Sequence, residues 1–174
     1  MGHRILYILA LLIIPFGTAY SMPITMNFTA YGFVAGGAPE DPISGTFVWE
    51  AATVNSTIDT LTSVDLTIDG YSYDISEIGY QADSSGNVGV DMIYGTLIGQ
   101  GVMSGSDDFW ITWDRNSLEG IHFNYTSSGE VGIWGTRSFR SFSITSVDVP
   151  EPTSLALLGL GLAGLAFARR KKEP

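Results

Sequence analysis

The stretch VDLTIDGYSYDI, residues 64–75, decides the fold class of this 174-residue chain. Apolar and polar residues alternate in it with a period of two, which is the pattern of a half-buried β-strand. The apolar positions are Val64, Leu66, Ile68, Tyr71, Tyr73 and Ile75. Between the two halves, Asp69-Gly70 is a pair typical of a tight hairpin turn. The stretch therefore predicts two antiparallel strands, with Asp65 and Thr67 on the face opposite to the apolar side chains.

The same alternation recurs throughout residues 22–148. Further strands are predicted at 24–33, 43–50, 88–94, 109–113, 121–125, 131–134 and 139–147. Clusters of Gly, Ser, Asn and Pro separate them, and residues 35–41 are predicted to form a loop. Most of the aromatic residues, including all four tryptophans, lie in this segment and can supply its core. The pattern favours a single all-β domain, either a β-sandwich or a jelly roll.

Residues 22–148 are strongly acidic. They hold 16 carboxylates, no lysine and three arginines, Arg115, Arg137 and Arg140, which gives a net charge of −13. Such a surface repels phosphate backbones and excludes a nucleic-acid partner. The chain also has no cysteine, which excludes disulfides, thiolate zinc sites and thiol catalysis.

Residues 1–21 have the order of a secretory signal peptide. His3 and Arg4 precede an apolar block at 5–16 that is too short to span a bilayer. Ala19 and Ser21 occupy the small positions of a cleavage site that would leave Met22 as the new N-terminus, and a cut after Ala19 is the alternative. We therefore predict export with removal of the signal peptide.

Residues 149–174 combine three features that act together. Pro150, Glu151 and Pro152 form a rigid, extended and accessible peptide. An apolar run at 155–168 follows, and it predicts a short single transmembrane helix. Four cations, Arg169, Arg170, Lys171 and Lys172, then stop transfer on the cytoplasmic side.

This order and spacing resembles the PEP-CTERM sorting signal of Gram-negative bacteria. The resemblance implies that an integral-membrane exosortase recognises the Pro-Glu-Pro motif. It also implies that the protein stays in the inner membrane transiently and is then sorted to the cell surface or released, often in organisms that make exopolysaccharide. The Gram-positive sortase motif is absent, because Thr153 is followed by Ser154 and not by Gly. A plain tail anchor is the remaining alternative.

The acidic domain offers little that predicts catalysis. His122 is the only histidine after the signal peptide, and it is expected on the strand face opposite to Ile121 and Phe123. Asp107 and Asp108 precede Trp110, and this set predicts a carbohydrate contact because aromatic rings stack on sugars while carboxylates bind hydroxyls. An acidic turn leading into a core strand is the alternative reading of the two aspartates. Trp110 alternates with its apolar neighbours and is expected to face away from the core.

We therefore predict a non-enzymatic protein without a required cofactor, with a structural or adhesive role associated with exopolysaccharide. A secreted carbohydrate-binding module and a glycoside hydrolase are the alternatives. No transition-metal site is predicted, since such sites need more than one histidine here. Calcium is the one ion for which the sequence offers ligands, at Asp83, Ser85 and Asn87, although the complete calcium-binding loop of an EF-hand is absent.

Overall fold

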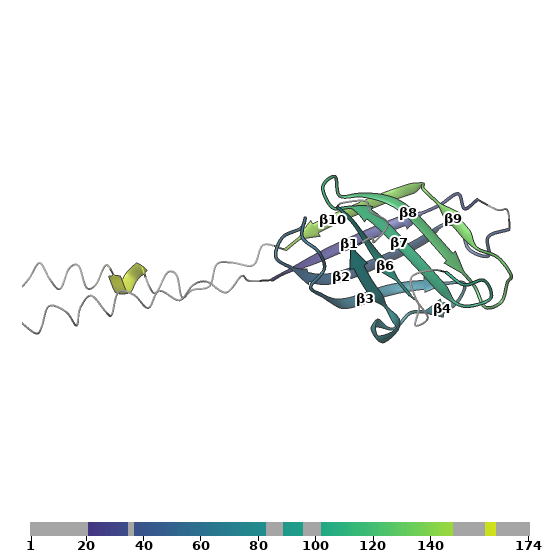
Figure 1. The fold of residues 1–174 in the computed structure, drawn as a ribbon, viewed down its shortest axis with the longest axis horizontal. Coiled ribbons are helices and arrows are strands. Elements are labelled where there is room, and N and C mark those ends of the chain that lie inside the picture. The colour runs from purple at the N-terminus through teal and green to yellow at the C-terminus, as the bar shows by residue number, and fades with distance from the viewer. Residues whose placement is uncertain (1–20, 35–36, 83–88, 96–101, 148–158, 163–174) are drawn as a thin grey trace, which may run out of the picture.

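The computed structural model describes residues 21–34, 37–82, 89–95, 102–147 and 159–162, and the domain within them is all β (Figure 1). Two antiparallel five-stranded sheets form it. The first sheet contains, in spatial order, β10 (Phe139–Ser146), β1 (Met22–Ala30), β2 (Ile43–Ala51), β3 (Thr60–Ile68) and β4 (Tyr71–Ser72). The second contains β5 (Gly79–Ala82), β6 (Val90–Tyr94), β7 (Asp108–Asp114), β8 (Glu119–Thr126) and β9 (Trp134–Thr136).

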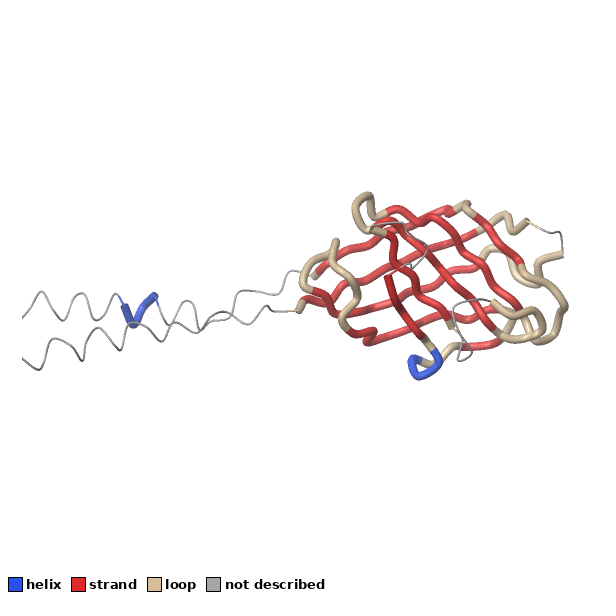
Figure 2. The backbone as a smooth tube through the Cα atoms, in the orientation of Figure 1, coloured by secondary structure: helices blue, strands red, loops and turns tan. Residues whose placement is uncertain are grey.

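The strand order is a meander. Within each sheet the strands lie beside their neighbours in sequence, except that β10 returns to pair with β1. The described strands therefore show none of the crossed connections of a jelly roll, and the sandwich is the alternative that holds. Figure 2 shows how the connections gather at the two ends of the strands. The all-β prediction is confirmed.

The core is a layer of aromatic and aliphatic side chains between the sheets. Three ring pairs bridge the two sheets with centroids 5.2 to 5.8 Å apart: Phe28 with Phe123, Phe47 with Phe109, and Trp49 with Trp113. Each buried aromatic side chain removes about 150 to 250 Å² from water, so these pairs supply a large share of the burial that holds the sheets together.

The predicted hairpin forms between β3 and β4. Leu66 and Ile68 are buried, and the polar residues Asp65 and Thr67 are exposed as predicted. Asp69 and Gly70 both have positive φ, 49° and 80°, as a type I′ turn requires. Tyr73 follows in the core at 6% exposure.

Beyond Tyr73 the predicted alternation fails. Ile75 is 37% exposed and opens the 3₁₀ helix η1 (Ile75–Glu77). The Asp74 carboxylate accepts the backbone N–H of Ser76 at 2.9 Å, while the Glu77 carboxylate accepts the N–H of Asp74 at 3.0 Å. This capping box turns the chain out of the sheet before Ile75 can reach the core, so the inward position predicted for Ile75 is wrong.

A β-bulge in β8 reverses another predicted side chain. Thr112 pairs with His122 and Trp113 pairs with Gly120, so Ile121 is the extra residue. Ile121 is 38% exposed, whereas Phe123 is fully buried. The two residues do not share a face as predicted, because the bulge interrupts the period of two.

Two strands in the second sheet differ from the sequence pattern. Residues 79–82 form β5 although their sequence shows no alternation. The strand predicted at 131–134 begins only at Trp134, and Val131 is 92% exposed. Both are short strands at the edges of the sheet, where burial imposes the weakest pattern on the sequence.

The loop predicted at 35–41 is described from residue 37 onward, and it joins the two sheets at one end. The Asp41 carboxylate accepts the backbone N–H of Gly32 at 3.0 Å. The Tyr125 hydroxyl donates to the Glu40 carbonyl at 2.8 Å and accepts the Glu40 N–H at 3.1 Å. These bonds attach the loop to β8 and to the end of β1.

The predicted signal peptide and sorting signal lie almost entirely outside the described residues. β1 begins at Met22, the first residue expected after cleavage. Residues 159–162 form one helical turn. No helix within the described ranges is long and apolar enough to cross a membrane.

Candidate functional site

The outward face of the second sheet carries a row of residues that crosses four strands. Tyr94 in β6 lies opposite Trp110 in β7, Trp110 lies opposite Asn124 in β8, and Asn124 lies opposite Gly135 in β9. Directly paired residues of antiparallel strands project to the same side. The neighbours of Trp110 along β7 are core residues, so the row faces away from the core.

Trp110 is the centre of this row. Its side chain is half-buried, whereas Phe109 and Ile111 on either side are fully buried. The His122 ring contacts the indole edge to face, with the centroids 5.1 Å apart and an interplanar angle of 69°. The structure thus places Trp110 on the predicted face and brings it together with Tyr94, His122 and Asn124.

Two glycines of the edge strands make room for side chains of this row. A Cβ at Gly79 would lie 2.3 Å from the Tyr94 ring, and a Cβ at Gly135 would lie 2.0 Å from the Asn124 amide oxygen. The Tyr94 ring and the Asn124 amide therefore rest directly on the backbone of the edge strands β5 and β9. Only glycine leaves this space, so these positions shape the aromatic row from both sides.

A hollow of about 430 Å³ lies at the β9 end of the row. It is lined by Gly32, Val34, His122, Gly135, Thr136, Arg137 and Ser138. Burial lowers the pKa of His122, and the charge of Arg137 lowers this pKa further. His122 is therefore neutral at pH 7, and Arg137 supplies the positive charge of the hollow.

The two predicted aspartates are engaged elsewhere in the fold. The Asp107 carboxylate accepts the backbone N–H of Ser128 at 2.9 Å and so joins β7 to the chain that leaves β8. Asp108 is 2% exposed, and its carboxylate accepts the N–H of Phe109 at 2.8 Å. The structure gives both aspartates local structural partners, and their part in carbohydrate contact stays a prediction.

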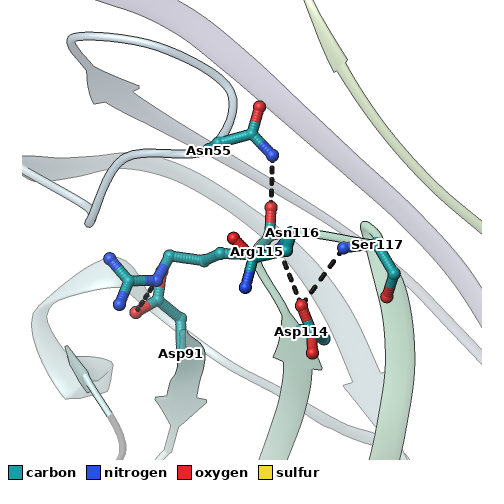
Figure 3. Close-up of polar contacts among 6 residues, drawn as sticks. All are labelled: Asn55, Asp91, Asp114, Arg115, Asn116 and Ser117. Carbon is teal, nitrogen blue, oxygen red and sulfur yellow. Dashed lines mark hydrogen bonds and ion pairs between the residues drawn. The ribbon is translucent and has the colours of Figure 1, made fainter. Parts of the chain in front are cut away.

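A buried ion pair closes one end of the second sheet (Figure 3). Asp91 in β6 is 1% exposed, and one carboxylate oxygen lies 3.3 Å from the Nε of Arg115. Burial raises the pKa of Asp91 to about 6, and the guanidinium of Arg115 opposes this rise. The Asn55 amide donates to the Arg115 carbonyl from the loop between β2 and β3.

The turn that carries Arg115 is fixed by Asp114. One oxygen of its carboxylate accepts the N–H groups of Asn116 and Ser117, at 2.7 and 3.1 Å (Figure 3). The sequence reasoning missed this ion pair. The feature that could have indicated the pair is a charged residue at an inward position of a strand. Asp91 occupies such a position, since it lies directly opposite the core residue Trp113.

The part of the chain that the structure describes contains no group of three or more side chains able to hold a metal ion. The predicted calcium ligands Asp83, Ser85 and Asn87 lie outside the described residues, as do the sorting motif at 150–152 and the basic residues at 169–172. The calcium prediction and the predicted roles of the sorting residues therefore stay predictions.

The two ends of the domain meet at one place. β1 and β10 are antiparallel neighbours, with Ile24 opposite Ser146. The Val147 N–H donates to the Pro23 carbonyl at 3.1 Å. The segments that precede and follow the domain therefore attach to the same end of the first sheet.

Comparison with protein families shows that residues 148–171 match the PEP-CTERM protein-sorting motif. The chain thus belongs to the class of exported proteins. It consists of an all-β domain followed by a sorting signal that directs it to the cell envelope or surface. The motif implies processing by an exosortase. Comparisons with curated proteins and with solved structures find no match.

Proposed function

We propose that this protein is a non-enzymatic component of the cell surface or extracellular matrix whose sandwich binds exopolysaccharide through the outward face of the second sheet. The observation that carries the proposal is the row of Tyr94, Trp110 and Asn124, which lie in register on the outward face of the second sheet. The binding would give the protein a structural or adhesive role.

The chemistry of the row suits a sugar chain. A sugar ring has apolar C–H faces and polar edges, so a half-exposed indole can cover the face while amides and ring nitrogens bind the hydroxyls. His122 packs against Trp110 and supplies such a group, whereas Asn124, the residue paired with Trp110 in β8, is only 9% exposed and supports the row from below.

A non-enzymatic role is supported by the state of the acidic and basic groups near the row. His122 packs against Trp110, and Asp108 is buried with its carboxylate accepting the backbone N–H of Phe109. Hydrolysis of glycosides needs two carboxylates that face each other across the bond to be cleaved. The glycoside hydrolase alternative would therefore need Asp107 and Asp108 to leave their backbone partners.

We further propose that the exosortase acts while the 155–168 segment holds the protein in the inner membrane. Pro150 follows the last residue of β10, Ser146, by only four positions. At about 3.3 to 3.6 Å per residue, so short a connection keeps the folded domain close to the point of processing.

The mass of the protein recovered from envelope and medium tests this: the mature form should lack both ends, and Glu151→Ala should retain the C-terminal segment. A wild-type protein that keeps its C-terminus would indicate a plain tail anchor.

Binding is tested with the full chain and the exopolysaccharide of the host. We expect the polymer to quench tryptophan fluorescence, and Trp110→Ala to weaken binding by about tenfold or more, since a central tryptophan often dominates an interface. Thr46→Ala on the outer face of the first sheet is the matched control and should bind normally. A polymer that binds Trp110→Ala as well as wild type would contradict the proposal. Shortening of the polymer that depends on Asp107 and Asp108 would instead establish a hydrolase.

A further inference from the structure

We infer that the glycan bound by this face is acidic, and that Arg137 binds a sugar carboxylate in the hollow beside His122. This inference rests on the proposed glycan binding and names the chemical class of the ligand. It follows from the distribution of the three cations of the domain, the geometry of the hollow and the charge of the surrounding surface.

Arg137 is the one arginine of the domain that the described contacts leave available. Arg115 is paired with the buried Asp91 at 3.3 Å. The guanidinium of Arg140 lies over the Tyr31 ring, 5.2 Å from its centroid. Arg137 is exposed, and among the residues that the structure describes no carboxylate lies within ion-pairing distance of it.

The backbone beneath Arg137 is held in place. The Thr136 hydroxyl donates to the Tyr31 carbonyl at 2.8 Å and accepts the Ser138 N–H at 3.0 Å. Arg137 therefore projects from a segment fixed on both sides, and little backbone freedom is lost when its side chain binds. A guanidinium presents N–H groups in a planar fork that matches the two oxygens of a carboxylate.

The position of the hollow selects a sugar carboxylate. His122 lines the hollow and also packs against Trp110, so it connects the anion-binding group to the ring on which a sugar would stack. The net charge of −13 repels densely charged polyanions over long distances. A polymer that carries a carboxylate on only some of its sugars is less densely charged, meets less repulsion and can still pair with Arg137.

The test compares two probes that differ in one functional group. Binding of the full-length protein is measured for a β-1,4-linked tetramer of three glucose residues and one glucuronate (the glucuronate tetramer) and for the β-1,4-linked glucose tetramer. We expect wild type to prefer the glucuronate tetramer by about tenfold, the size of one charge-assisted contact. Arg137→Gln should remove the preference, so that the two tetramers bind this variant with similar affinity. Arg137→Lys should recover only part of it, because lysine keeps the charge and lacks the planar fork.

Arg140→Gln is the matched control, since it removes the same charge from the adjacent strand and should keep the preference. Equal loss in Arg140→Gln and Arg137→Gln would overturn the inference, because total charge and not Arg137 would then select the probe. Equal binding of both tetramers by wild type would also overturn it while leaving the proposed glycan binding intact. Failure of wild type to bind either tetramer or the host polymer would overturn the proposed function and this inference together.

Discussion

The two sheets of the sandwich differ in whether their buried positions hold polar residues. In the first sheet the buried positions are apolar and the polar side chains face outward. In the second sheet, polar and charged residues occur at buried positions. All the buried polar residues of the described chain lie in β6 to β9 or directly after β8: Asp91, Asp108, Thr112, Asn124, Thr126, Ser127 and Thr136.

The outer faces differ in the same sense. On the first sheet, the outward hydroxyls and amides bond to one another across the strands, as in the Thr29–Ser44 contact at 2.9 Å and the Thr46–Asn27 contact at 2.8 Å. These groups satisfy one another's hydrogen-bonding capacity around a shallow hollow of about 370 Å³. The second sheet presents Trp110 and an available Arg137 instead. A sheet that departs from simple alternation usually does so for function, and here the departure marks the proposed binding face.

The largest effect expected from this contrast concerns the ion pair within the second sheet. Arg115→Ala should lower the free energy of unfolding by about 2 kcal/mol at pH 7, because the buried Asp91 must then either stay charged without its cation or take up a proton. Urea unfolding measures the loss. The double variant Asp91→Asn, Arg115→Ala should recover most of it, since no buried charge then remains. A loss below about 1 kcal/mol would mean that the pair contributes nothing to this sheet.

The pH dependence of stability should reveal the titration of the Asp91 carboxyl. The pKa of Asp91 is raised in the folded protein from 3.8 to about 6, so the folded state binds the proton more tightly than the unfolded state does. The stability advantage of the protonated form is complete below about pH 4 and is lost as the pH rises through about 6. Between pH 4.5 and pH 7 this carboxyl should lower stability by about 2 kcal/mol.

Comparison of wild type with Asp91→Asn isolates that contribution from the repulsion among the other carboxylates. The difference in unfolding free energy between the two proteins should change over this pH range, with Asp91→Asn losing less stability as the pH rises. Parallel curves for the two proteins would show that Asp91 does not titrate in this window.

The contrast between the sheets also explains what could be predicted from the sequence. The first sheet follows the period of two, so the hairpin of Leu66 and Ile68 with its Asp69-Gly70 turn is readable directly. In the second sheet the bulge at Ile121 and the inward Asp91 break that period. A bulge depends on the pairing between strands and leaves no local pattern, which is why the inward position of Ile121 was predicted wrongly.

The candidate site was predictable only in part. The alternation around Trp110 indicates an outward ring, because its immediate neighbours are apolar. The spacing of residues in the sequence could not predict that Tyr94, Asn124 and Arg137 belong to the site. Each joins the row or the hollow through strand register or a turn between strands. Asp108 was placed beside Trp110 by proximity in sequence, yet the fold buries it.

A smaller effect is expected at the glycine beneath the row. Gly135→Ala should cost about 1 to 2 kcal/mol of stability, because the new Cβ meets the Asn124 amide oxygen and forces it to move. The displaced amide should also weaken binding of the host polymer more than it weakens folding. Thermal unfolding and polymer binding measured on the same protein separate the two losses. Normal binding by Gly135→Ala would show that the space left by Gly135 is dispensable.

The smallest effect should come from the outer face of the first sheet. It tests whether the outer faces of the two sheets really differ in polymer binding. Thr46→Val keeps the shape of the side chain and removes its hydrogen bond to Asn27. Both side chains border water, so solvent can replace the lost bond, and we expect a change in stability below about 0.5 kcal/mol with unchanged polymer binding. Urea unfolding and fluorescence quenching by the polymer measure both quantities. A clear loss of binding in Thr46→Val would shift the binding function to the hydroxyl face, because that face has no other reason to depend on one exposed threonine.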